Sequence, residues 1–136
     1  MKTLIATLAC ISAPLFAAEL KLTINEVNAT PGKIYIEMFK GKQPYLAGDS
    51  YTATIVRAQK GTVSTLFNNL EPGTYAIRLF HDENNNAQLD TNLFGIPTEG
   101  VSFSNNATMQ FGPPSYEQMT ITISQGTNAE SMAISY

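Results

Sequence analysis

Residues 67–82 have the sequence FNNLEPGTYAIRLFHD, in which a tight turn leads directly into a strand. Pro72 and Gly73 form the turn, because proline presets its own φ and glycine accepts a positive φ. Apolar side chains then recur at every second position from Tyr75 to Leu79, which is the period of a strand with one buried face. A similar L-x-P-G-x-Y turn leads into a core strand in many secreted β-sandwiches, so we predict that the Tyr75 hydroxyl holds down the neighbouring loop.

The same alternation continues on both sides of this stretch, and it predicts about seven core strands separated by turns that contain Gly or Pro. The predicted strands are Leu20–Ile24, Ile34–Phe39, Tyr51–Ala58, Thr62–Phe67, Tyr75–Phe80, Met119–Ser124 and Met132–Tyr136. Weaker signals indicate a short strand near Val101–Phe103 and one helical turn at Gln43–Gly48. We therefore predict an all-β fold, a single antiparallel β-sandwich of the immunoglobulin-like or transthyretin-like kind, with one long ordered loop.

Composition is typical of a compact globular domain. The 136 residues correspond to one domain, and 43% hydrophobic against 14% charged residues permit a packed core. Only 8 Lys and Arg residues stand against 11 Asp and Glu residues, for a net charge of -3. This acidic balance argues against nucleic-acid binding, which needs a basic surface. A single His and a single Cys argue against Cys/His zinc sites and Cys–His catalysis.

The first residues have the layout of a secretory signal peptide. Lys2 gives a positive start, Leu4–Phe16 is a mostly apolar run, and the small residues Ala17 and Ala18 follow it. The run is shorter than the roughly 20 residues of a membrane-spanning helix, and no later stretch is long enough to span a membrane. We therefore predict a cleaved signal peptide, with cleavage after Ala17 or Ala18.

Cleavage at this point divides the chain into a signal peptide at residues 1–17 and a β-sandwich domain at residues 18–136, which we expect in the periplasm or outside the cell. Cys10 would leave with the signal peptide, so the mature domain would hold together without a disulfide. A lipid anchor on Cys10 is the alternative, but Thr7 stands where a leucine is expected and little apolar chain precedes the cysteine.

The longest segment without alternation, from Asp82 to about Ser115, begins with a pattern that resembles a calcium loop. Structureless loops beyond about 12–15 residues are uncommon in compact domains and are often functional. Oxygen-bearing side chains occupy alternate positions at its start, and Ca²⁺ prefers about six to eight oxygen ligands. These residues are Asp82, Asn84, Asn86, Gln88 and Asp90. We expect carboxylates from the two Asp residues, amide carbonyls from the two Asn residues and the backbone carbonyl of Gln88.

Two positions depart from a complete calcium loop. Ala87 stands where glycine normally makes the sharp turn, and a positive φ at a non-glycine residue costs roughly 1 kcal/mol. Leu93 stands where an EF-hand has its bidentate Glu, so Glu99 is the candidate for the missing carboxylate. The flanking segments are not two helices, which excludes an EF-hand. We therefore predict a weak Ca²⁺ site, with an Asn-rich turn that binds no ion as the alternative.

Four short runs of this region resemble one known family. They are His81–Asn92, Phe94–Gly100, Phe103–Asn106 and Gly112–Ser115. The family pattern is similar to H-D-x-N-x-N-G-x-L-D-x-N, G-x-P-x-E-G and F-S-N, with Ala87 in place of its glycine. On these motifs the chain resembles the uncharacterised secreted bacterial family called domain of unknown function 2141. The resemblance implies a signal peptide, a β-sandwich and export, and it brings no established activity.

These features favour a non-enzymatic exported module of unknown biological role, whose weak Ca²⁺-binding loop orders a surface for a protein or glycan ligand. His81 lies at the end of a predicted strand, at a position where the alternation places buried side chains. We therefore expect it to hydrogen-bond a loop carbonyl rather than to catalyse. One alternative is a hydrolase that uses Asp82, Asp90 and Glu99, although the chain has no Trp to stack a sugar. Another is a structural or adhesive subunit that pairs strand edges.

Overall fold

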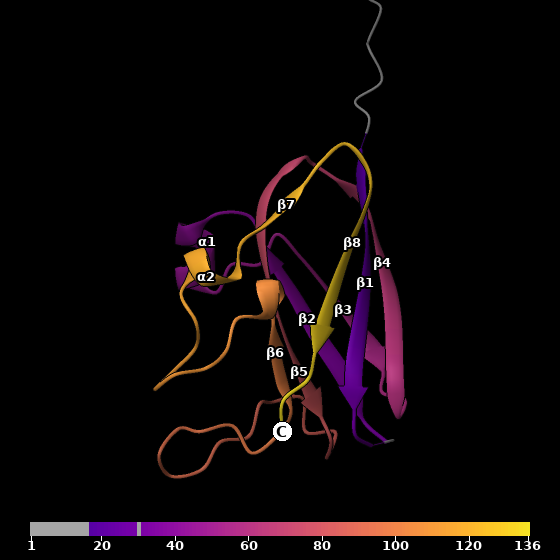
Figure 1. Cartoon of the computed structure of the whole chain (residues 1–136). Helices are drawn as coiled ribbons and strands as arrows, with labels where there is room; N and C mark the ends of the chain where they lie inside the picture. Colours follow the sequence, from indigo (N-terminus) through magenta and orange to yellow (C-terminus); the bar gives the residue numbers. More distant parts are fainter. Residues whose placement is uncertain (1–16, 30) are drawn as a thin grey trace, which may run out of the picture.

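The computed structural model describes residues 17–29 and 31–136, and these are mostly in strands (Figure 1). The strands are β1 (Ala18–Val27), β2 (Lys33–Phe39), β3 (Thr52–Arg57), β4 (Gly61–Leu70), β5 (Gly73–Asp82), β6 (Val101–Phe103), β7 (Ile121–Ile123) and β8 (Gly126–Ala133). Two short helices, α1 (Lys42–Ala47) and α2 (Tyr116–Met119), and the 3-10 turn η1 (Ser104–Asn106) lie between them. The all-β prediction is confirmed, and each predicted strand has a counterpart.

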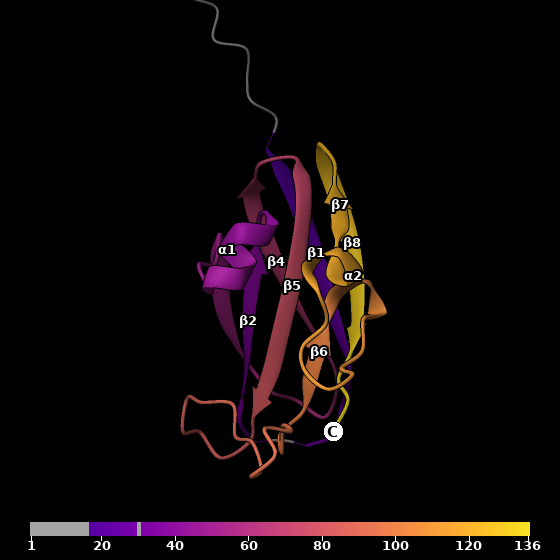
Figure 2. The same cartoon turned by 90° about the vertical axis from the view of Figure 1, so that its left-hand side faces the viewer.

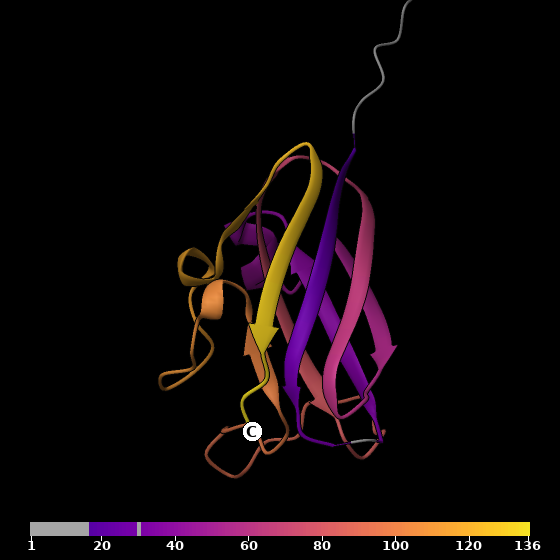
Figure 3. The ribbon, with the colours of Figure 1, turned by 45° about the vertical axis from the view of Figure 1, so that its right-hand side comes forward.

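The strands form two sheets that pack face to face (Figures 1 and 3). One sheet has the order β4-β1-β8, and the other has the order β3-β2-β5-β6, with β7 also paired to β5. The named strand pairs are antiparallel with the exception of β1 and β8, which run parallel with Leu22 opposite Glu130. The chain reaches β8 by crossing over from β7 in the other sheet. The predicted single β-sandwich is therefore confirmed, with one parallel pair.

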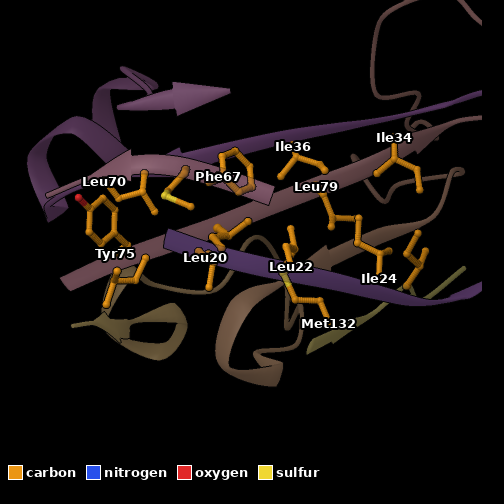
Figure 4. Close-up of a cluster of buried hydrophobic side chains, with 14 of the residues drawn as sticks. Leu20, Leu22, Ile24, Ile34, Ile36, Phe67, Leu70, Tyr75, Leu79 and Met132 are labelled. Atoms are coloured by element: carbon orange, nitrogen blue, oxygen red, sulfur yellow. The ribbon is translucent and has the colours of Figure 1, made fainter. Parts of the chain in front are cut away.

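The main core lies between the two sheets and consists of alternate side chains of each strand (Figure 4). Leu20, Leu22 and Ile24 of β1 are at most 1% exposed. The other sheet contributes the inward side chains Ile34, Ile36, Met38, Tyr75, Ile77 and Leu79. Burying one such aliphatic side chain contributes about 1.5–3 kcal/mol, so this core supplies the main driving force for folding.

Tyr75 is the corner tyrosine that the turn sequence predicted. Its side chain is fully buried, and its hydroxyl donates to the carbonyl oxygen of Glu71 at 2.5 Å. Its ring meets the ring of Tyr51 edge-on, with 5.5 Å between the ring centroids. Burial, together with the neighbouring Tyr51 hydroxyl, raises the pKa of Tyr75 above its ordinary value. The predicted tie between strand β5 and the preceding loop is therefore confirmed.

A second, smaller cluster lies on the outer face of the five-stranded sheet, where α1 and α2 cover it (Figure 2). Its members are Phe39, Tyr45, Ala76, Phe103, Tyr116 and Met119. The Tyr116 hydroxyl donates to the carbonyl of Thr74 at 3.0 Å and accepts the backbone N–H of Gly41 at 2.9 Å. The Tyr45 hydroxyl donates to the carbonyl of Pro114 at 2.9 Å. These bonds fasten α2 to strand β5 and α1 to the segment around α2, and α1 confirms the predicted helical turn.

Two predicted strands have different bounds in the structure. Met119 ends α2 instead of starting β7, because Ser115 and Gln118 form a capping box that holds the preceding residues in a helical turn. Strand β8 begins at Gly126, ahead of its predicted start at Met132. The residues before Met132 are small or polar and exposed or only partly buried at the edge of the sheet, so no apolar alternation marks them.

The predicted signal peptide at residues 1–17 lies outside the described residues except for Ala17, which is exposed. Ala18 is 1% exposed and begins β1, where it pairs with Leu70 on one side and with Gly126 on the other. The first strand therefore starts directly after the predicted cleavage point. In the part of the chain that the structure describes, no helix is long and apolar enough to cross a membrane.

Candidate metal-binding loop

The predicted calcium loop connects β5 to β6 at one end of the sandwich (Figures 1 and 2). Strand β5 ends at Asp82, which is fully buried, and the chain returns to β6 through Glu99, which is 6% exposed. Residues 84–89 between them are exposed to solvent. The loop therefore has a buried base with two carboxylates and a ring that faces the solvent.

Asp82 shapes the first half of this loop. One of its carboxylate oxygens accepts the backbone N–H of Asn86 at 3.1 Å, and the other accepts that of Ala87 at 3.0 Å. These bonds curl the backbone around Asp82, with φ values of 59° at Asn85 and 61° at Ala87. The left-handed conformation predicted at the glycine position is present, and an alanine there carries roughly 1 kcal/mol of strain.

Three of the predicted ligands, Asn84, Asn86 and Asp90, come together on the solvent side of the loop. The Asn84 side-chain amide donates to the Asp90 carboxylate at 2.6 Å. The Asn86 amide donates to both oxygens of the same carboxylate, at 2.9 and 3.0 Å. The side-chain oxygens of the two Asn residues accept the backbone N–H groups of Asn86 and Gln88. Two side-chain amide groups thus donate to the Asp90 carboxylate from its solvent side.

Glu99 closes the base of the loop. Its two carboxylate oxygens accept the backbone N–H groups of Glu83 and Asp90, each at 3.0 Å. A buried carboxylate needs such partners, because an unpaired charge away from water is costly. Glu99 therefore joins the two ends of the ring that runs from Glu83 to Asp90, and both of its oxygens are engaged in doing so.

The arrangement fits a weak oxygen site better than a strong metal centre. Gln88, the remaining candidate, is exposed and offers its backbone carbonyl. Among the described residues, no three acidic, His or Cys side chains gather as a metal-binding group. A cation here would depend on Asp90, on backbone carbonyls, and on the Asn84 and Asn86 amides turned to present oxygen. Turning these amides would change the bonds that their oxygens accept from the N–H groups of Asn86 and Gln88. Such a set is all oxygen with little charge, which suits Ca²⁺ rather than zinc or copper.

His81 is fully buried at the end of β5, and both of its ring nitrogens are engaged. Nε2 lies 3.1 Å from the carbonyl oxygen of Pro31, which can only accept, so Nε2 carries the proton of this bond. Nδ1 lies 2.8 Å from the Tyr136 hydroxyl, which also accepts the backbone N–H of Asn28 at 3.2 Å. The expected bond from His81 to a loop carbonyl is confirmed, and the ring joins three chain segments.

Sequence reasoning missed a short hairpin at the far side of this loop, residues 91–97, which we name the apolar tip. An isolated bridge joins the two ends of the apolar tip. Its large side chains face the solvent, with Leu93 101%, Phe94 88% and Ile96 58% exposed. The signal that would have revealed the apolar tip is a group of large apolar residues within an otherwise polar loop.

A pocket of about 430 Å³ lies beside the loop. Its volume falls in the range of small-ligand sites. The loop supplies Ile96, Pro97 and Glu99 to its wall, and the other lining residues include Val101 of β6 and Tyr136, the last residue. The loop therefore forms one part of the wall of this pocket.

The fold and the loop define a small two-sheet β-sandwich with an oxygen-rich loop and an exposed apolar tip at one end. A bacterial family described as "Uncharacterized protein conserved in bacteria (DUF2141)" matches residues 22–131. The chain belongs to this family, which confirms the resemblance found in its motifs. No curated protein and no solved structure gives a significant match.

Proposed function

We propose that this protein is an exported, non-enzymatic β-sandwich module in which the 82–90 loop binds Ca²⁺ weakly and thereby orders a binding surface. The observation that carries the proposal is the convergence of the Asn84 and Asn86 amides on the Asp90 carboxylate. Ca²⁺ at this place would replace the two amide N–H groups as the positive partner of Asp90. The amides would then turn their oxygens toward the ion, as Ca²⁺ prefers.

Asp90 links the proposed ion site to the pocket. Its carboxylate faces the Asn amides, its backbone N–H donates to Glu99, and its carbonyl accepts the N–H of Thr98 at 2.9 Å. Thr98 directly follows Pro97, which lines the pocket together with Glu99. An ion that fixes Asp90 would therefore also fix the wall of the pocket, which is how calcium would order a binding surface.

The contacts of the ionisable groups support a role in binding rather than in catalysis. Asp82 and Glu99 each accept two backbone N–H groups, which gives both buried carboxylates a structural use. His81 is held by Pro31 and Tyr136 through both ring nitrogens. A catalytic acid or base needs to reach the proton that it transfers in the substrate. We therefore assign these groups to holding the loop.

Export rests on the signal peptide predicted at residues 1–17, and it would place the domain in the periplasm or outside the cell. Extracellular calcium modules with few charged ligands have dissociation constants of about 10⁻⁴–10⁻³ M. A site of this strength would be filled where ambient calcium is of that order. The pocket and the apolar tip would then present a stable surface to a protein or glycan ligand.

Thermal melting of the purified mature protein, in EDTA and in Ca²⁺, tests this proposal. Binding to the folded state alone at about 100 times the dissociation constant adds roughly 2.7 kcal/mol of stability. We expect Ca²⁺ to raise the melting temperature of the wild type but not that of Asp90→Asn. Asp49→Asn, an exposed Asp outside the loop, is the matched control and should respond like the wild type. Equal melting of the wild type in EDTA and in Ca²⁺ would contradict the proposal.

The edge strand β3 supports a second candidate function, pairing of strand edges with another chain. Residues 52–57 contain neither Lys nor Pro, which commonly protect exposed edges. Ile55 is 55% exposed and lies opposite Tyr35, whose ring stacks on that of Phe80 with centroids 5.0 Å apart. Sedimentation velocity separates the candidates: edge pairing predicts an oligomer that Ile55→Lys abolishes and that EDTA leaves intact. A wild-type monomer at all concentrations would contradict pairing between copies of this chain.

A further inference from the structure

The pocket of about 430 Å³ lies between β6 and the end of β8, two edge strands that are side by side (Figures 1 and 3). Val101 and Ser135 exchange two backbone hydrogen bonds of 2.9 Å each, and this bridge is isolated. Two residues further on, Phe103 lines the pocket instead of continuing the ladder. Beyond it, the N–H of Asn105 in η1 donates to the Glu130 carboxylate of β8 at 2.9 Å. The pocket is therefore a short gap between two strand edges that is closed at both ends.

The side chain of Ser102 is an unpaired polar group in the wall of this pocket. Ser102 lies opposite Leu79, whose side chain is in the main core, so its own side chain points to the inner side of the sheet. The residue is 5% exposed and lines the pocket. Among the residues that the structure describes, its hydroxyl has no hydrogen-bond partner, and it keeps some contact with solvent. A buried hydroxyl without a partner is costly, and a ligand in the pocket would supply one.

The backbone of Phe103 offers two further groups to the same gap. Along an antiparallel strand, the N–H and C=O groups of successive residues point to alternate sides. Those of Val101 point to Ser135, so those of Phe103, two residues on, point to the same side and face the pocket. Phe103 is only 8% exposed. A ligand residue flanked by two amide groups matches this pair, because its N–H donates to the carbonyl and its C=O accepts the N–H.

The rest of the wall decides the charge and the side chain of such a ligand. The wall is mostly apolar and includes Ile96, Pro97 and Met109. Of the described residues that line it, none is Lys, Arg or His, and Glu99 is a buried acid. An anion would lose its water there without gaining a positive partner. We propose that this pocket binds a short, uncharged peptide with an aliphatic side chain.

The two closed ends of the gap limit the length of the peptide. The bridge of Val101 with Ser135 blocks one end, and the contact of Asn105 with Glu130 blocks the other. A strand of a partner protein that runs through the gap would have to break one of these contacts. The geometry therefore favours a free peptide of a few residues over a long strand. The inference deepens the proposed function and rests on it only in taking the pocket as the binding surface.

Titration with a blocked residue, N-acetyl-leucine amide, tests this binding directly. We expect saturable shifts of the amide NMR signals of residues 101–103 and 107–109, with a dissociation constant on the order of 1 mM. The signals of β4, in the other sheet, should not move. N-acetyl-leucine carries a carboxylate in place of the terminal amide and should bind at least about tenfold more weakly. Equal binding of the two compounds, or no shift of the pocket signals at about 10 mM amide, would overturn the inference.

The variant Ser102→Ala tests the role of the unpaired hydroxyl. It should bind the amide about two- to tenfold more weakly, because one hydrogen bond is lost. Ser64→Ala, at an exposed position of β4, is the matched control and should bind like the wild type. Unchanged affinity of Ser102→Ala would contradict the assignment of this hydroxyl to the ligand.

Thermal melting without ligand supplies an independent readout on the same hydroxyl. Because it has no partner in the free protein, Ser102→Ala should keep or raise the melting temperature. Ser104→Ala should lower it, since the Ser104 hydroxyl accepts the N–H of Ile77 and donates to the carbonyl of Met119. Equal losses in the two variants would mean that Ser102 is bonded within the protein, which would overturn the inference.

A longer peptide tests the closed ends. The leucine amide extended by alanines on both sides should bind no more tightly than N-acetyl-leucine amide, because the added residues find no room in the gap. Binding that is at least about tenfold tighter would assign the gap to a strand of a partner protein and would overturn the choice of a free peptide.

Parallel titrations in EDTA and in Ca²⁺ separate this inference from the proposed function. Binding of the amide in EDTA, together with the absence of any heat of Ca²⁺ binding, would support the peptide pocket and remove the role of calcium. Heat of Ca²⁺ binding without binding of the amide in either condition would overturn the peptide pocket and leave the calcium loop. Binding of the amide that Ca²⁺ strengthens would support both.

Discussion

Glu99 accepts the backbone N–H of Asp90 at 3.0 Å, so a buried carboxylate next to β6 holds the far end of a loop that begins at β5. Its other oxygen holds Glu83 in the same way. The base of the loop is thus closed by protein groups alone. Asn84 and Asn86 lie in solvent outside this base, and they contact the carboxylate of the partly exposed Asp90.

Glu99→Gln should destabilise the fold. An amide retains one oxygen but sets its own N–H₂ against a backbone N–H, so one buried donor loses its partner. Hydrogen bonds to a charged group contribute about 1.5–3 kcal/mol, and we expect a loss of that order in the free energy of unfolding from urea titration. Glu83→Gln, which removes a charge from the same loop, should cost much less. Equal losses in both variants would show that the two hydrogen bonds accepted by Glu99 contribute no more to stability than the charge of Glu83.

Ala87→Gly should stabilise the protein, because glycine adopts the φ of 61° at this position without strain. The gain is smaller than the strain itself, since glycine also has more freedom in the unfolded chain. We expect an increase of up to about 1 kcal/mol in the free energy of unfolding. Ala129→Gly in the extended strand β8 is the control, and it should destabilise by about 0.5–1 kcal/mol. A loss at both positions would contradict the strain assigned to Ala87.

Tyr75→Phe should cost about 1 kcal/mol at neutral pH, because it removes the hydrogen bond to the Glu71 carbonyl. The pKa of Tyr75 is raised in the folded protein, chiefly by burial. Its contribution is therefore complete below the ordinary pKa of 10.0 and is lost as the pH rises above it, because the unfolded chain releases the proton first. This group lowers the free energy of unfolding by up to about 1.4 kcal/mol per pH unit there.

A comparison of the wild type with Tyr75→Phe at alkaline pH provides the control for this prediction. Tyr45 and Tyr136 also have raised pKa values through burial, so the stability of Tyr75→Phe should still fall above pH 10, but less steeply than that of the wild type. Urea titrations at several alkaline pH values measure both slopes. Identical slopes would mean that the Tyr75 hydroxyl does not keep its proton in the folded state.

The exported protein should begin at Ala18. Ala18 is buried between Leu70 and Gly126, so a cut after it would remove the first paired residue of β1. A cut after Ala17 leaves the strand whole. The intact mass of the protein recovered from the periplasm or the medium shows whether cleavage follows Ala17 or Ala18. Retention of Met1, or a lipid on Cys10, would contradict the predicted signal peptide.

The sandwich could be predicted from the sequence because its strands bury one face and therefore alternate. Leu20 to Ile24 and Tyr75 to Leu79 show the pattern clearly, and the alternate apolar side chains of both runs lie in the core. The start of β8 could not be predicted in this way, since its residues before Met132 lie at the sheet edge and bury little.

The candidate site was predictable where local spacing determines the backbone. The alternate oxygen-bearing side chains located the loop, and the glycine position predicted the left-handed conformation of Ala87. The two hydrogen bonds that Glu99 accepts join the two ends of the loop, and the spacing of residues along the sequence does not reveal such a contact. The apolar tip was missed because three apolar residues, Leu93, Phe94 and Ile96, follow neither a strand nor a helix period.

Calorimetric titration of the mature protein with Ca²⁺ tests the calcium loop most directly. We predict one site with a dissociation constant on the order of 10⁻⁴–10⁻³ M, tighter binding by Ala87→Gly, and no detectable heat with Asp90→Asn. The opposite result would be no heat from the wild type at about 10 mM Ca²⁺, well above that range, in which case residues 82–90 form an Asn-rich turn and not an ion site.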